Sequence, residues 1–96
     1  MNNHFLLTQK AERDLEGIAD YIGERNPKAA DKLLEEFEQV FQLLVNSPKI
    51  GNSRPDLTKR QLRFWPVDSY LVIYKEASVL EIVRILSGYR NLFKIL

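Results

Sequence analysis

The chain has 96 residues, a formal net charge of +1 and no cysteine, which excludes disulfides and thiolate chemistry. We expect residues 1–96 to form a single domain in the cytoplasm, because no apolar run approaches the ~20 residues of a membrane span and the start of the chain has no signal-peptide pattern. The charge is uneven: residues 10–46 carry −4 and residues 48–96 carry +5, so either these are ordinary solvated faces or the basic half meets an anionic partner.

The first half of the chain predicts a short strand and two helices. Residues 5–7 form an apolar run that suits a strand added to the edge of a sheet, and Thr8 follows as a helix N-cap. Asn26 and Pro27 are a second N-cap and a favoured first helical residue, and residues 46–48 end that second helix. The two apolar stripes comprise Ala11, Leu15, Ile18, Ala19 and Ile22, and then Ala30, Leu33, Leu34, Phe37, Val40, Phe41 and Leu44. The short connection makes the two helices an antiparallel hairpin.

The second half predicts an antiparallel meander of three strands. Residues 61–67, 70–76 and 79–86 are runs rich in β-branched, aliphatic and aromatic side chains, and small polar pairs separate them. Asp68-Ser69 suits a two-residue hairpin loop, which places Val67 opposite Tyr70. Residues 48–60 read as a polar loop before the meander. The predicted fold class is therefore α+β: strand, helical hairpin, meander.

Alternation assigns the side chains of the first hairpin to two faces. One face is apolar and holds Leu62, Phe64, Pro66, Leu71 and Ile73, and we expect the helices to cover it. The other face is mixed basic and aromatic and holds Arg63, Trp65, Tyr70, Val72 and Tyr74. A slip of one residue would move Arg84 between the faces, so the register of the third strand stays open.

The residues available for chemistry are mainly basic. The single histidine, His4, and the absence of cysteine predict no metal site, and the sequence has no phosphate-binding or dinucleotide motif, so we expect no cofactor. Glu35, Glu36 and Glu38 suit a solvated helix face. Arg63, Arg84 and Arg90 lie in or just after strands, where a charge kept only for solubility is less usual, and Arg can grip phosphate or carboxylate with two hydrogen bonds.

An ordered set of residues covers nearly the whole chain. It comprises Leu7-Thr8, Ala11, Asp14-Leu15, Ile18, Tyr21-Ile22, Pro27, Ala30, Leu43-Leu44, Pro48-x-x-Gly51, Arg54, Asp56-Leu57, Arg63, Tyr70 to Tyr74, Ile82 to Leu86, Gly88 and Arg90. In this order and spacing the chain resembles the RelE/ParE superfamily of toxins, and specifically its ParE branch. The resemblance implies a toxin of a type II toxin–antitoxin (plasmid stabilisation) system.

The resemblance also implies partners and a target. A cognate antitoxin would neutralise the chain by folding onto it, in a hetero-oligomer that meets operator DNA only through the antitoxin. ParE-like toxins poison DNA gyrase, and the implied target-binding residues are Arg54, Lys59, Arg60, Arg63, Arg84, Tyr89 and Arg90. No membrane partner is expected.

Two alternatives stay open. The RelE-like branch cleaves mRNA on the translating ribosome, and in that case Arg63, Arg84, Tyr89 and Arg90 would be the catalytic set. Leu71 stands where that branch commonly has Arg, and Ser87 stands where many relatives have His, so the nuclease lacks its usual groups. The other alternative is an inactive relative that only binds an antitoxin. The apolar tail around Leu92, Phe93 and Leu96 either packs as a last turn or faces a partner.

Overall fold

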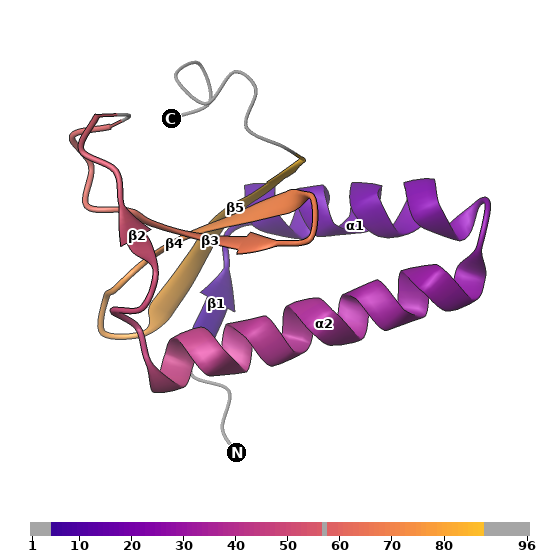
Figure 1. Ribbon diagram of the computed structural model, residues 1–96, viewed down its shortest axis with the longest axis horizontal. Coiled ribbons are helices and arrows are strands. Elements are labelled where there is room, and N and C mark those ends of the chain that lie inside the picture. Colours follow the sequence, from indigo (N-terminus) through magenta and orange to yellow (C-terminus); the bar gives the residue numbers. More distant parts are fainter. Residues whose placement is uncertain (1–4, 57, 88–96) are drawn as a thin grey trace.

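The computed structural model describes residues 5–56 and 58–87, and its elements follow the predicted order (Figure 1). Strand β1 (Phe5–Leu7) leads into helix α1 (Gln9–Gly23) and helix α2 (Pro27–Asn46). Strands β2 (Asn52–Ser53), β3 (Arg63–Val67), β4 (Tyr70–Lys75) and β5 (Leu80–Ser87) follow. The predicted α+β class is confirmed.

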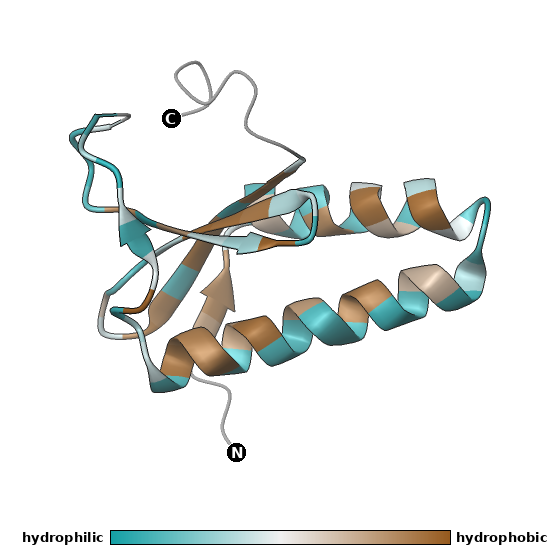
Figure 2. Cartoon of the chain, viewed as in Figure 1, coloured by the Kyte–Doolittle hydropathy of each residue, from teal (hydrophilic) through white to brown (hydrophobic). Residues whose placement is uncertain are grey.

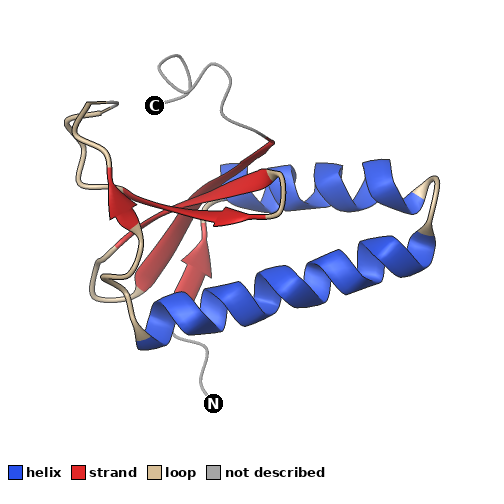
Figure 3. Cartoon of the chain, viewed as in Figure 1, coloured by secondary structure: helices blue, strands red, loops and turns tan. Residues whose placement is uncertain are grey.

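The five strands form one sheet in the order β1-β5-β4-β3-β2 (Figure 3). β1 runs parallel to β5 at one edge, and every other pairing is antiparallel. Val67 lies opposite Tyr70, so the two-residue hairpin loop is confirmed. β2 was not predicted: residues 48–60 read as loop, but Asn52 and Ser53 pair with Phe64 and Arg63.

Both helices begin where their sequence signals place them. The Thr8 side chain accepts a hydrogen bond from the backbone N–H of Ala11 at 3.1 Å, and Asn26 accepts one from Ala29 at 3.1 Å. These bonds satisfy backbone donors that have no partner inside the first turn. The two helices run side by side in opposite directions, and none of the described helices is long and apolar enough to cross a membrane (Figure 1).

The helices cover the face of the sheet opposite to the one we expected. Phe37 and Phe41 of α2 share a core with Val72 and Tyr74, which lie on the face that alternation predicted to be mixed basic and aromatic. Figure 2 shows the apolar stripes of the two helices and the apolar strands. The prediction was wrong because both faces are apolar. The face with Trp65, Tyr70 and Tyr74 offers the larger aromatic area for the phenylalanines of α2.

The expected core face forms a second, smaller cluster. Leu62, Phe64, Leu71, Ile73 and Leu86 are buried there, with Val83 packed against them. The sheet therefore buries apolar side chains on both faces, as the continuous apolar pattern of the third strand indicated.

A bulge in β5 settles the register that the sequence left open. Ile73 pairs with Arg84 and the next residue, Tyr74, pairs with Ile82, so Val83 is the extra residue. Ile82 and Ile85 are three positions apart, yet both belong to the core beneath the helices. Simple alternation would have placed them on opposite faces.

Candidate functional site

A cleft of about 500 Å³ lies where β2, the loop after it and the start of β3 meet. Its lining includes Lys59, Arg60 and Arg63, together with Ser53 and Glu76. We call this the basic cleft. The structure thus brings together three of the residues that the sequence predicted to bind a target.

The charge in the basic cleft has few internal partners. The side chains of Lys59 and Arg60 are exposed, and across residues 5–56 and 58–87 neither makes an ion pair. Glu76 lies 3.5 Å from the amino group of Lys49 and is engaged there. Cations that share a concave site repel one another and attract an anion, so the cleft suits a phosphate or carboxylate group.

Arg63 also binds the backbone of the segment just before β2. Its Nη1 donates to the carbonyl oxygen of Gly51 at 2.9 Å and to that of Lys49 at 3.3 Å. Because the guanidinium group is fixed by these carbonyls, its position in the basic cleft is set before any ligand arrives.

Tyr74, which the sequence analysis did not place among the target-binding residues, holds the same turn from the side of the core. Its hydroxyl donates to the carbonyl oxygen of Pro48 at 2.7 Å and accepts from the N–H of Gly51 at 2.8 Å. The side chain is fully buried, and burial raises the pKa of its phenol above the ordinary value. The turn of residues 48–51 is therefore fastened at both ends to one hydroxyl.

This contact explains the glycine of the Pro48-x-x-Gly51 pattern. A Cβ atom at position 51 would clash with the Tyr74 hydroxyl and would lie 2.7 Å from Cε1 and 2.9 Å from Cζ. Real Cβ atoms do not approach other atoms this closely. Glycine is required here for close approach rather than for turning the chain.

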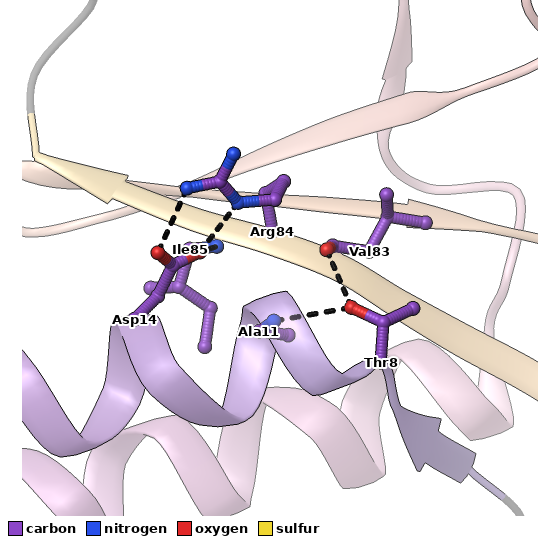
Figure 4. Close-up of polar contacts among 6 residues, drawn as sticks. All are labelled: Thr8, Ala11, Asp14, Val83, Arg84 and Ile85. Carbon is purple, nitrogen blue, oxygen red and sulfur yellow. Dashed lines mark hydrogen bonds and ion pairs between the residues drawn. The ribbon is translucent and has the colours of Figure 1, made fainter. Parts of the chain in front are cut away.

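Arg84 lies away from the basic cleft, on the side of helix α1 (Figure 4). Its Nε donates to Asp14 Oδ2 at 2.8 Å and its Nη2 donates to Oδ1 at 2.9 Å. The pair is largely buried, with 22% of the Arg84 side chain and 15% of the Asp14 side chain exposed. The hydrogen bonds that Arg84 donates to Asp14 raise the pKa of the guanidinium group above its ordinary value.

Asp14 and Thr8 together close the edge of β5 beyond β1. Asp14 Oδ2 also accepts from the backbone N–H of Ile85 at 2.9 Å, and the Thr8 hydroxyl donates to the carbonyl oxygen of Val83 at 2.8 Å (Figure 4). These backbone groups lie past the end of the β1 pairing. The side chains of the N-cap Thr8 and of Asp14 in α1 thus occupy an edge that another strand would otherwise approach.

The other predicted target-binding residues have separate positions. Arg54 forms two hydrogen bonds with Asp56, at 2.9 and 2.8 Å, and the bond from Arg54 lowers the pKa of this carboxyl group. Tyr89, Arg90 and the apolar tail lie outside the described residues. Among the described residues no group of histidine and carboxylate side chains is placed to hold a metal ion.

A second concavity, of about 310 Å³, lies between β1 and the two helices. Leu7, Leu15 and Leu34 contribute apolar side chains to its lining, and Glu12 and Glu16 contribute carboxylates. We call this the acidic groove. It suits an apolar segment that carries basic residues on its flanks.

Comparison with known proteins gives one family and one fold. A family model described as the ParE toxin of the type II toxin–antitoxin system parDE matches residues 5–92. A solved structure described as the chromosomal ParDE toxin–antitoxin system from P. aeruginosa superposes with a TM-score of 0.72 at 20% sequence identity, covering 88% of this chain and 95% of that one. A search of curated proteins returned no match.

Proposed function

Because this chain belongs to the ParE family of toxins of type II toxin–antitoxin systems, we propose that it arrests growth by poisoning DNA gyrase. The observation that carries the proposal is the basic cleft, in which Lys59 and Arg60 are exposed and Arg63 is held in place. Gyrase at work is bound to DNA, so the target offers phosphates to such a cleft. We place this action in the cytoplasm, where gyrase is found.

We further propose that a cognate antitoxin neutralises the toxin by covering the acidic groove. The apolar lining from Leu15 and Leu34 would take the apolar face of an antitoxin segment, while Glu12 and Glu16 would pair with its basic residues. The product would be a hetero-oligomer that contacts operator DNA only through the antitoxin.

The test is a gyrase assay with the purified, antitoxin-free chain. We expect inhibited supercoiling and trapped DNA cleavage from the wild type, and at least a tenfold weaker effect from Arg60→Ala. Lys28→Ala is the matched control, because Lys28 is an exposed cation of α2 outside the basic cleft. A folded wild-type chain with no effect on gyrase would end the proposal.

The ribosome-dependent endoribonuclease has less support. It would use Arg63 and Arg84 at one phosphate, whereas Arg63 lines the basic cleft and Arg84 is bound by Asp14 elsewhere. Position-specific cleavage of translated messages would favour it over gyrase poisoning. Harmless overexpression in cells that lack the antitoxin would instead favour the inactive relative.

A further inference from the structure

We infer that the Tyr74 hydroxyl is the positioning group that keeps the basic cleft in its binding-ready shape. The inference rests on the proposed function, because it names what prepares the cleft for its target. Tyr74 itself is not proposed to touch the target. It acts through the turn of residues 48–51 and through Arg63.

First, the Tyr74 hydroxyl holds the turn of residues 48–51 and is not needed to fill the core. The ring of Tyr74 belongs to the core beneath the helices, and a phenylalanine ring would fill the same space. The oxygen adds two bonds that both end on the turn, at the Pro48 carbonyl and at the Gly51 N–H. Gly51 is buried, so loss of the oxygen would leave its N–H without this partner and favour a rearranged turn.

The second step is that the turn fixes the wall of the cleft. Gly51 is followed directly by β2, in which Ser53 pairs with Arg63. In addition, the Arg63 side chain donates a hydrogen bond to the Gly51 carbonyl oxygen. Ser53 and Arg63 both line the basic cleft, so a displaced Gly51 would move one wall and one of its three cations.

Third, the loop that carries the other two cations, Lys59 and Arg60, connects the two strands that form this wall. Lys59 and Arg60 lie between β2 and β3, and their segment is held by a bond from the Arg60 N–H to the Thr58 hydroxyl at 3.0 Å and by one from the Leu62 N–H to the Arg60 carbonyl at 2.9 Å. Thr58 to Arg60 join β3 through Gln61 and Leu62, so a displaced Arg63 shifts the end of the sheet from which they extend. A site held ready in this way binds more tightly than one that must order itself on contact.

The test compares Tyr74→Phe with Tyr70→Phe in the gyrase assay. Tyr70 lies on the same strand and packs against Phe37, but its hydroxyl makes no hydrogen bond within the described residues. We expect Tyr74→Phe to weaken inhibition about tenfold, although no charge is lost, and Tyr70→Phe to behave as wild type.

A double-mutant cycle separates positioning from plain stability. If Tyr74 acts through the cleft, Tyr74→Phe should cost little inhibition in a chain that already carries Arg63→Ala, since the cation that the turn positions is then gone. A merely structural hydroxyl would cost the same in both backgrounds. Equal costs would overturn the inference.

A readout on the isolated chain keeps the inference testable if the wild type fails to inhibit gyrase. Trypsin cleaves after Lys59 and Arg60, and we expect cleavage there at least several times faster in Tyr74→Phe than in wild type or Tyr70→Phe. Cleavage after Lys32, inside α2, requires that helix to open and should rise less. Cleavage rates at Lys59 and Arg60 that match those of Tyr70→Phe would refute the positioning role whatever the target is.

Discussion

The guanidinium group of Arg84 and the carboxylate of Asp14 meet side by side through two hydrogen bonds of 2.8 and 2.9 Å, across 70 residues of sequence. The pair joins the bulged strand β5 to helix α1, and the same carboxylate also accepts the Ile85 N–H. Arg84, which the sequence analysis assigned to target binding, therefore links the helix to the sheet.

We predict that Asp14→Ala lowers the free energy of unfolding by about 2–3 kcal/mol, because it leaves both a largely buried guanidinium group and the Ile85 N–H without their acceptor. Arg84→Ala should cost less, since Asp14 keeps its bond to Ile85. Urea denaturation of the two variants measures the difference. A larger loss from Arg84→Ala would contradict this ranking.

The same geometry predicts how Arg84 variants affect toxicity. Arg84→Ala should reduce growth arrest only in proportion to the loss of folded protein, because Arg84 is not part of the basic cleft. Arg60→Ala should reduce arrest with unchanged stability. An Arg84→Ala protein that is as stable as wild type and yet inactive would return Arg84 to the target-binding set.

The buried phenol of Tyr74 predicts a loss of stability at alkaline pH. Burial raises the folded-state pKa above 10.0, the ordinary value that applies in the unfolded chain. The stabilisation is complete below pH 10, and it declines as the pH rises from about 10 through the raised pKa, because the unfolded chain then releases this proton first. The stability of Tyr74→Phe should lack this contribution to the decline at alkaline pH.

The measurement is the urea midpoint at pH 9 and pH 11 for the wild type, Tyr74→Phe and Tyr70→Phe. The wild type and Tyr74→Phe differ only in this phenol, and Tyr70→Phe controls for the loss of a tyrosine hydroxyl, so the comparison isolates the contribution of Tyr74. A Tyr74→Phe chain that loses as much stability between the two pH values as the wild type would show that the phenol is not the cause.

Gly51→Ala should destabilise the fold by about 1–3 kcal/mol, the usual cost of forcing an added methyl into a packed site. The new Cβ would meet the Tyr74 hydroxyl and the ring atoms Cε1 and Cζ. The double variant with Tyr74→Phe should recover part of the loss, since the hydroxyl is removed while the ring contacts remain. Thermal unfolding of the three variants tests this, and strictly additive losses would rule out the contact.

Local sequence signals predicted the elements well because their causes are local. Thr8, Asn26 and Pro27 start the helices through bonds or backbone angles within a few residues, and Asp68-Ser69 closes a hairpin between adjacent strands. The side of the sheet that packs on the helices was not predictable in this way. Alternation separates two faces, but it cannot choose between them when Val72 and Tyr74 compete with Leu71 and Ile73.

In the candidate site, too, local features were predictable from the sequence and long-range contacts were not. Lys59, Arg60 and Arg63 are close in sequence, and the structure places them in one cleft. The contacts of Asp14 and Tyr74 were not predicted, because their partners lie 70 and more than 20 residues away. The Pro48-x-x-Gly51 spacing indicated that position 51 needs a glycine, but it does not reveal that Tyr74 is the side chain packed against that glycine.

The acidic groove predicts how an antitoxin is retained. Glu16 lines the groove and is exposed, so Glu16→Lys should preserve the fold, since lysine is a good helix former, while placing a cation against the basic flank of the antitoxin segment. We expect the complex with the cognate antitoxin to weaken about tenfold at low salt and less at high salt, because a charge at the rim is screened. Glu35→Lys is the control: it makes the same change at an exposed position of α2 outside the groove. If both variants bind the antitoxin like the wild type, the antitoxin occupies another surface, whereas equal weakening by both would show that only the overall negative charge of the helices matters.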